Sequence, residues 1–400
     1  MTRTITRGII QPSISFVDIT TGIVQKDIWS ELEDGMWREF SINNHLLNNT
    51  IGEVDQNKWL PIFPKYKVIN PGFRWDATAQ KIIADLYKPD IQHGASLNTF
   101  LGCTERYFAQ FAGKKIGVHL SGGLDSSLII ALLKHFSIPF VAIGLSSHRF
   151  EFRTEKRIQQ IMAEYANDAL LLDMDDYPFY GNLDKKPKHQ IPDSNIKMLD
   201  ASFALAQEFK SRGCQVVLSG QGGDTLLAES MQNIETFEGY NIGNEFTFPW
   251  EQDFVYNPMG MELHSFFSDK GIIDQITSLR LGENEDPLKM WTRAFFASLL
   301  PRELSQFTYC ADFFGYSMDG LQQAKPTFKL LFEEAYDYLQ HPLFSTKGTT
   351  QILNTDILTL EYNTYCEFCS KLSIAVWIHT LFRDDQGDNF CKRQRKSTRD

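Results

Sequence analysis

Apolar and polar positions follow two alternating rhythms between residues 115 and 218. Short runs rich in valine, leucine and isoleucine occur at residues 115–120, 140–145, 169–172 and 215–218. Longer stretches with helical spacing of their apolar residues lie between them, at residues 126–135, 154–166 and 198–210. Short apolar runs that alternate with helices of about ten residues or more are typical of βαβ units. The pattern therefore predicts an α/β fold built on a parallel sheet.

The region before this pattern has a different character. Residues 1–95 contain strand-like runs at residues 13–17 and 67–69, and a turn is expected at Asn70-Pro71-Gly72. We therefore expect a short, β-rich N-terminal region.

A helical pattern at residues 96–111 leads into the alternating segment. After Glu229 the chain is expected to be mainly helical, apart from a loop-rich interval at residues 233–258. The sequence thus predicts two parts: the β-rich region at residues 1–95, and an α/β domain with a helical C-terminal part at residues 96–400.

Composition and charge narrow the choice of partners. The chain has a hydrophobic content of 42%, a net charge of −11 and a pI of about 5.4, so a broad cationic face for nucleic acid is not expected. The basic run at residues 392–396 is expected to be a solvated end rather than a binding arm. Neither a secretory leader pattern nor a long apolar stretch is found, which favours a cytoplasmic protein without a membrane partner.

Three of the six cysteines lie close together in the sequence, and their spacing can be compared with that of zinc sites. Cys366 and Cys369 form a C-x-x-C pair, and Cys391 follows. This spacing can hold zinc, but a second close cysteine pair or a histidine pair is missing. We therefore expect structural thiols, reduced as in a cytosolic protein.

Residues 121–127, with the sequence SGGLDSS, lie between the first predicted strand and its helix. Gly122 and Gly123 allow a tight turn that brings backbone N–H groups towards an anion, and the helix start adds its positive dipole end. Three hydroxyl groups can add hydrogen bonds, those of Ser121, Ser126 and Ser127. Asp125 would repel phosphate unless a cation such as Mg²⁺ intervened. The segment therefore predicts a site for nucleotide phosphates and Mg²⁺, the alternative being an ordinary strand–turn–helix corner.

A second glycine-rich segment, residues 218–224 (LSGQGGD), follows the fourth predicted strand. Because the carboxyl ends of parallel strands share one edge of the sheet, Asp224 is expected to approach Asp125 there. Two carboxylates at this edge would hold Mg²⁺ on a triphosphate.

These segments resemble the motifs of the asparagine synthetase family. Residues 121–127 look like its PP-loop of the ATP pyrophosphatase type, and residues 218–224 resemble its second motif, written S-G-E-G-A-D. Residues 260–269 (GMELHSFFSD) are similar to a third motif, G-x-E-x-R-x-P-F-L-D, and residues 65–75 resemble the end of the family's N-terminal domain. The resemblance implies a PP-loop fold, an ATP and Mg²⁺ requirement, and formation of a carbon–nitrogen bond through an acyl-adenylate.

The resemblance also implies roles for individual residues. The residues implied to hold the β- and γ-phosphates are Ser121, Gly122, Gly123, Ser126 and Ser127. Asp125 and Asp224 are implied to hold Mg²⁺. The residues implied to lie beside the nucleotide are Val141, Gly144, Leu145, Ser219 and Gly220. Glu262 matches a family glutamate near the reacting carboxylate, and the alternative is a solvated or ion-paired glutamate.

The chain departs from the family pattern in three places. Glutamine-hydrolysing members begin with a cysteine nucleophile, whereas Thr2 follows Met1 here and the β-rich region is short for a glutaminase domain, so glutamine hydrolysis is not expected. Gln221 replaces the glutamate of the second motif, as happens in β-lactam synthetases and lasso-peptide cyclases, which use an amine on the substrate itself. The family lysine that follows a Leu-Pro segment is absent, with Cys310 near the expected place, and Arg302 is the candidate substitute.

These observations predict an ATP-dependent ligase that joins a small-molecule or peptide carboxylate to an amine. Two alternatives stay open. A non-catalytic nucleotide-binding protein would explain the missing lysine, and a tRNA-modifying PP-loop enzyme would be expected to carry a basic face. A homodimer or a partner protein is compatible with the sequence.

Overall fold

The structure is a computed structural model, which describes residues 15–25, 65–69, 71–146, 153–186, 197–233, 235–246, 249–306, 314–339, 344 and 362–382. Several positions singled out from the sequence lie outside these ranges, namely Thr2, Asn70, Cys310, Cys391 and the basic run at residues 392–396.

A five-stranded sheet forms the centre of the α/β domain, with all of its strands parallel. Its strand order is β10 (Glu262–Ser265), β9 (Val216–Ser219), β6 (Ile116–His119), β7 (Phe140–Ser146) and β8 (Asp168–Asp173). The strand β6 lies in the middle, so the segment that follows it leaves a strand that is paired on both sides. The α/β fold with a parallel sheet is confirmed.

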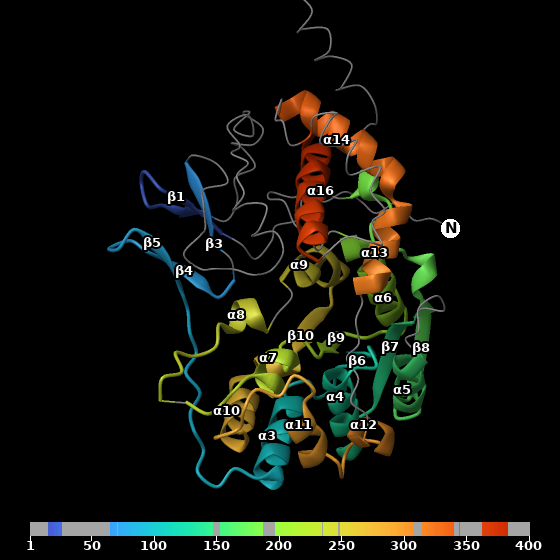
Figure 1. Cartoon of the computed structure of the whole chain (residues 1–400). Coiled ribbons are helices and arrows are strands. Elements are labelled where there is room, and N and C mark those ends of the chain that lie inside the picture. Colours follow the sequence, from blue (N-terminus) through green and yellow to red (C-terminus); the bar gives the residue numbers. More distant parts are fainter. Residues whose placement is uncertain are drawn as a thin grey trace, which may run out of the picture.

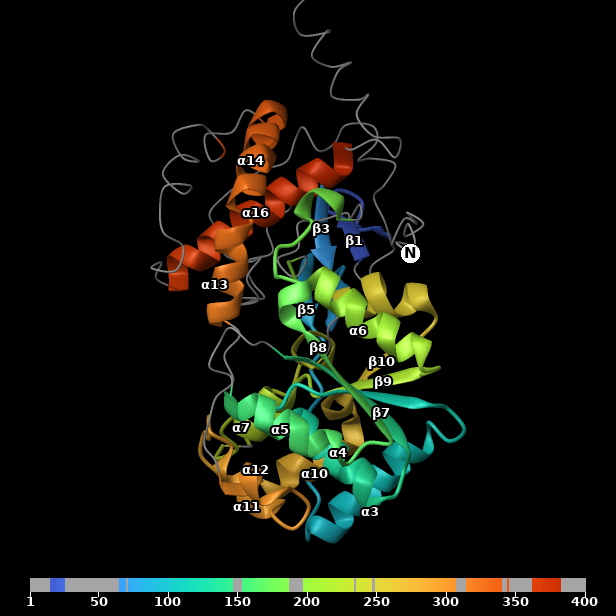
Figure 2. The same ribbon diagram turned by 90° about the vertical axis from the view of Figure 1, so that its right-hand side faces the viewer.

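Helices cover both faces of the sheet (Figure 2). The helices α4 (Leu124–His135) and α5 (Arg153–Ala163) lie on one face, and α6 (Leu199–Ser211) lies on the other. Strand residues are buried on both faces of the sheet. Val118 and Leu218 belong to the buried cluster that includes α4, whereas Ile143 and Val217 belong to the cluster that includes α6. Such two-sided burial accounts for the continuous apolar runs in the sequence.

The α4 side of the sheet is closed by further helices. The helix α3 (Leu97–Ala109), capped by Ser96, packs against α10 (Lys270–Leu279). Shorter helices complete this side, namely α7 (Gly223–Ala228), α8 (Ile242–Glu245), α11 (Met290–Phe295) and α12 (Arg302–Gln306). The short helix α9 (Pro249–Glu251) lies on the other side, since its Trp250 belongs to the cluster that includes α6. A π-helical turn, Gln252–Tyr256, follows α9.

The described chain after Glu229 is mainly helical, as expected, and the strand β10 is an addition that the sequence pattern did not indicate. It pairs in parallel with β9, in the register Glu262 with Val216 and Ser265 with Ser219. Its residues alternate in burial, with Leu263 and Ser265 buried and Glu262 exposed, so they form no apolar run.

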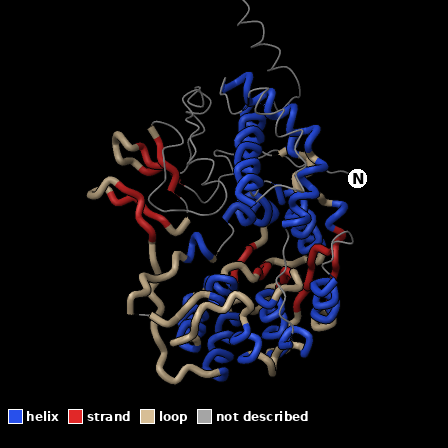
Figure 3. The backbone as a smooth tube through the Cα atoms, viewed as in Figure 1, coloured by secondary structure: helices blue, strands red, loops and turns tan. Residues whose placement is uncertain are grey.

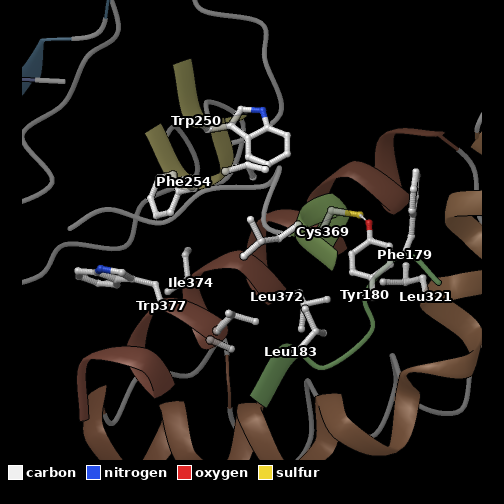
Figure 4. Packing of buried hydrophobic residues seen from close by; sticks show 14 of the residues in the cluster. Phe179, Tyr180, Leu183, Trp250, Phe254, Leu321, Cys369, Leu372, Ile374 and Trp377 are labelled. Atoms are coloured by element: carbon white, nitrogen blue, oxygen red, sulfur yellow. Dashed lines mark hydrogen bonds between the residues drawn. The ribbon is translucent and has the colours of Figure 1, made fainter. Parts of the chain in front are cut away.

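A group of three helices stands at one end of the molecule (Figure 1), formed by α13 (Phe314–Gln323), α14 (Lys325–Leu339) and α16 (Tyr362–Phe382). Residues from α16 pack with residues near α6 and the π-helical turn, as Trp377, Ile374 and Phe254 do in Figure 4. Trp377 is fully buried. The helical C-terminal part therefore shares a core with one face of the sheet.

The N-terminal strands form two small antiparallel sheets (Figure 3). One contains β2 (Val24–Gln25), β1 (Ser15–Asp18) and β3 (Tyr66–Ile69), and the other pairs β4 (Phe73–Asp76) with β5 (Lys81–Ala84). Phe16, Tyr66 and Val68 belong to the same buried cluster as Trp377. The described N-terminal strands thus contribute to the core that α16 completes.

Cys369 lies in α16 as a buried free thiol, and its sulfur is 3.0 Å from the Tyr180 hydroxyl (Figure 4). Cys366 also falls in α16, while Cys391 is outside the described ranges. Among the helices of the described ranges, none combines the length and apolar character that crossing a membrane requires.

Candidate functional site

The SGGLDSS segment connects β6 to α4 at the carboxyl edge of the sheet. Gly122 has a φ of +82°, a left-handed conformation that favours glycine, and Gly123 is the N-cap of α4. No described side chain caps this helix start. The first N–H groups of a helix have no partner within it, so those of α4 can receive an anion.

The three serines of the segment differ in their surroundings. The hydroxyl oxygens of Ser121 and Ser126 are 2.8 Å apart, and the Ser121 oxygen also accepts a hydrogen bond from the Gly123 N–H. Ser127 is fully buried, and its hydroxyl finds no hydrogen-bond partner among the described residues. Ser121 and Ser126 thus lie at the turn itself, whereas the structure places Ser127 in the interior rather than at a surface open to phosphate.

The second glycine-rich segment presses directly against the first. A β-carbon added at Gly220 would come within 2.9 Å of the Ser126 nitrogen, and one added at Gly223 would lie 2.4 Å from the Asp125 carboxyl carbon. Gly222 has a φ of +80° and precedes α7. The sequence expectation that the two segments meet at one edge of the sheet agrees with this packing.

Asp125 and Asp224 share a single cation, the ammonium group of Lys289. The Lys289 nitrogen is 2.6 Å from both Asp125 carboxylate oxygens and 2.6 Å from Asp224 Oδ1. The Asp125 and Lys289 side chains are only 16% and 9% exposed, whereas Asp224 is 94% exposed. The acid pair is therefore buried on one side and open to solvent on the other, where a ligand could approach.

Burial and charge act against each other in this cluster. Burial raises the pKa of the Asp125 carboxyl, and the Lys289 ammonium partly offsets that rise. Burial alone would lower the pKa of Lys289, but the two carboxylates outweigh it and leave that pKa raised. Lys289 is therefore held in its charged form.

The chemistry of this donor set fits Mg²⁺. The carboxylates of Asp125 and Asp224 both approach one positive centre. Mg²⁺ in nucleotide sites is usually bound by one or two carboxylates together with phosphate oxygens. The missing side chains at Gly220 and Gly223 leave the backbone close to the same place. Asp125 and Asp224 are thus the residues that would hold the ion.

Lys289 is the site residue that the sequence did not indicate. The resembled family carries a lysine after its Leu-Pro segment, which is absent after Leu300-Pro301 here, whereas Lys289 precedes that segment. Arg293, one helical turn later, is buried and adds positive charge near Asp125. Arg302, the expected substitute, is exposed at the start of α12.

The residues expected beside the nucleotide divide into two groups. Gly144 and Leu145 lie near the carboxyl end of β7, and a β-carbon at Gly144 would come within 2.0 Å of the Leu120 carbonyl oxygen. Ser219 ends β9 at the same edge. Val141 is fully buried in the amino-terminal half of β7, three residues and about 10 Å before Gly144. The structure therefore does not bring Val141 to the nucleotide edge.

Gln221 lies in the loop between β9 and α7, where it is half-buried. Its carbonyl oxygen accepts a hydrogen bond of 2.5 Å from the Ser265 hydroxyl at the end of β10. The loop that carries Gln221 is thus tied to the edge strand, which keeps the residue at the same edge as Asp125.

Glu262 is not in the place that the third motif suggested. It begins β10 opposite Val216, so it lies at the amino edge of the sheet, about 10 Å along the strand from Ser219. Its carboxylate is 2.7 Å from the Lys114 nitrogen and 3.1 Å from His264 Nε2, and it is 53% exposed. The hydrogen bond from Lys114, followed by that from His264, lowers the pKa of Glu262. The position matches an ion-paired surface glutamate and corrects the expected catalytic placement.

Comparison with known families agrees with the location of the site. Residues 109–244, which are 136 of the 400 residues, match the family model described as asparagine synthase. The chain therefore carries an asparagine-synthase-like domain, and both glycine-rich segments lie within it. This domain supports an ATP-using ligase that forms carbon–nitrogen bonds. A comparison with curated proteins found none that matches.

Proposed function

We propose that this chain uses ATP to convert a carboxylate into an acyl-adenylate and then transfers the acyl group to an amine. The products would be an amide, AMP and pyrophosphate. The observation that carries the proposal is the convergence of two glycine-rich loops, with Asp125 and Asp224 on one cation, inside the asparagine-synthase-like domain.

In the first step the two loops hold the triphosphate so that a substrate carboxylate can attack its α-phosphorus. The uncapped start of α4 and the turn at Gly122 would bind the β- and γ-phosphates. Mg²⁺, held by Asp125 and Asp224, would neutralise phosphate charge. A substrate carboxylate oxygen attacks the α-phosphorus, and the bond to the β-phosphate oxygen breaks. Lys289 and Arg293 supply positive charge near the departing pyrophosphate.

In the second step the amine nitrogen attacks the acyl carbon and AMP leaves. The amine must lose its proton, and removal of a proton by a positioned base contributes about 10²- to 10⁴-fold to such reactions. Glu262 is too far along β10 to serve as that base. Gln221 carries no carboxylate, so its amide would position the reacting groups rather than take the proton.

We propose an amine carried by the substrate, so that the amide closes a ring such as a lactam or macrolactam, in place of ammonia released from glutamine. One sequence feature supports this choice: Gln221 replaces the glutamate of the second motif. The substrate would then be a small molecule or peptide of natural-product biosynthesis.

A non-catalytic nucleotide-binding protein is the second candidate. The placement of Glu262 at the opposite edge favours it, because this leaves the described part of the site without an identified base. Such a protein would bind ATP and Mg²⁺ through the same loops without turnover.

The deciding experiment is release of pyrophosphate from ATP by the purified chain, tested with pools of amino acids and peptides that carry both a carboxylate and an amine. Pyrophosphate formed together with AMP and an amide supports the ligase. ATP binding without turnover in every pool would favour the non-catalytic protein, and ADP as the product would contradict both.

A further inference from the structure

The ammonium group of Lys289 stands at the point where the acid pair would otherwise bind a metal ion. One nitrogen contacts three carboxylate oxygens of Asp125 and Asp224, each at 2.6 Å. A divalent cation bridging the same two carboxylates would need that space. The lysine and the ion therefore compete for one position.

The surrounding backbone fixes Lys289 in this place. Lys289 has a φ of +54°, a left-handed conformation that non-glycine residues adopt only where other contacts enforce it. Its N–H donates to the Asp286 carbonyl, and its own carbonyl accepts the first hydrogen bond of α11, from Arg293. Arg293 in turn donates to the carbonyls of Leu288 and Leu304. The lysine, itself buried, is thus presented to the acid pair by a hydrogen-bonded turn at the surface.

Displacing this lysine by a bare ion would be unfavourable. The side chain is 9% exposed, so an ammonium displaced from Asp125 and Asp224 would stay partly buried, and the described residues offer it no further ion pair. A nucleotide changes this balance, because its triphosphate brings several negative charges with the ion. Those phosphates would pair with the ammonium as the carboxylates turn to the metal.

We propose that Lys289 fills the metal position of the nucleotide-free protein, so that a divalent cation binds tightly only together with ATP. The inference rests on the proposed function only in taking ATP as the nucleotide. It assigns to Lys289 a thermodynamic coupling between the two ligands, in which each raises the affinity for the other.

The test uses Mn²⁺ in place of Mg²⁺, because free Mn²⁺ can be counted by electron paramagnetic resonance. The full chain is titrated with Mn²⁺ alone and with α,β-methylene-ATP, whose α–β linkage is not cleaved. For the wild type we expect weak Mn²⁺ binding alone and binding tighter by about 10-fold or more with the nucleotide. Lys289→Met should bind Mn²⁺ alone about 10-fold more tightly than the wild type.

Two further variants complete the design. Lys114→Met removes a lysine that is paired with Glu262 at the opposite edge, and it should leave Mn²⁺ binding unchanged. Lys289→Arg keeps the charge at the site and should keep Mn²⁺ binding weak without nucleotide, even if Lys289→Met fails to fold. Equal Mn²⁺ affinity of the wild type and Lys289→Met, or tight binding to both wild type and Lys289→Arg without nucleotide, would overturn the proposal. These measurements require no turnover, so a missing ligase activity would not change their outcome.

Discussion

Gly223 approaches Asp125 so closely that a β-carbon at Gly223 would lie 2.4 Å from the Asp125 carboxyl carbon. A real β-carbon does not come so near another carbon, so the loop after β9 can reach the loop after β6 only with glycine here. The position of Asp125 therefore requires that residue 223, in the loop after β9, has no side chain.

The first prediction is that Gly223→Ala destabilises the protein by about 1–3 kcal/mol and reduces ATP turnover. Forcing a methyl group into filled space displaces its neighbours, and here the neighbour is the metal-binding carboxylate. Urea unfolding and pyrophosphate release measure the two effects. Gly102→Ala is the matched control, because its nearest neighbour would be 3.8 Å away and alanine favours the interior of α3 by about 1 kcal/mol. Wild-type stability of Gly223→Ala would show that the loops can separate without cost.

The second prediction is that Asp125→Asn and Asp224→Asn each reduce ATP turnover at least ~100-fold, equivalent to about 3 kcal/mol of transition-state stabilisation. Each change removes one of the two carboxylates that would oppose the charge of Mg²⁺. Pyrophosphate release measures turnover, and circular dichroism should show an intact fold in both variants. Unchanged turnover in either one would contradict its assignment to the metal site.

The third prediction concerns Glu262. Its motif suggested a role near the reacting carboxylate, but its place in the structure indicates none. Glu262→Gln should leave both ATP–pyrophosphate exchange and amide formation close to wild type, since the residue lies at the amino edge of the sheet. Losing its surface ion pair with Lys114 should cost less than about 1 kcal/mol of stability. Slower amide formation with normal exchange would instead restore Glu262 as the base.

The fourth prediction is a pH effect on stability that arises at His119. Burial lowers the pKa of His119 to about 4, and its Nε2 is 2.6 Å from the Tyr256 hydroxyl oxygen. The folded-state pKa lies below the unfolded value of 6.5, so the stability due to neutral His119 is complete above pH 6.5 and is lost as the pH falls towards 4. At pH 5 this loss amounts to at most about 2 kcal/mol.

Urea unfolding at pH 7.5 and pH 5 checks this effect against His119→Gln, which keeps an acceptor for Tyr256. The wild type should lose more stability than the variant between these two pH values. Burial also raises the pKa of Glu251 to about 7, and this group titrates in both proteins, so the comparison removes its contribution. Identical pH dependence of the two proteins would show that His119 is protonated as readily when folded as when unfolded.

The fifth prediction is that the purified chain releases no glutamate from glutamine. The described cysteines, Cys103, Cys214 and Cys369, are buried free thiols, and burial raises the pKa of Cys103 and Cys214, so these thiols are poor nucleophiles. An enzyme-coupled glutamate assay with ATP and Mg²⁺ present measures the reaction. Glutamate above the level of a boiled sample would refute the prediction.

Much of the α/β domain could be predicted from the sequence because its local patterns and its tertiary structure agree. The runs at residues 115–120 and 215–218 are apolar because both faces of their strands are buried, and a glycine-rich loop follows each run. The meeting of Asp125 and Asp224 then follows from parallel pairing alone.

Other features depend on contacts that no local pattern reveals. In the strand β10, Glu262 and His264 alternate with the buried Leu263 and Ser265, so no apolar run marks it. Lys289 lies in a turn without periodic spacing, and its role arises only because the chain returns to the acid pair there. A match to a sequence motif therefore did not reveal that Glu262 lies at the edge of the sheet opposite Asp125.

The large share of buried apolar residues in α16 bears on how the protein is made. Residues of this helix, including Trp377 and Ile374, complete a buried cluster that also contains Phe16, Val141 and Phe209. A ribosome adds about 5–20 residues per second and exposes the N-terminal segments first. Side chains laid down early must therefore wait for residues 362–382 to emerge before that cluster can close. During this interval the nascent chain would expose an unfilled apolar surface.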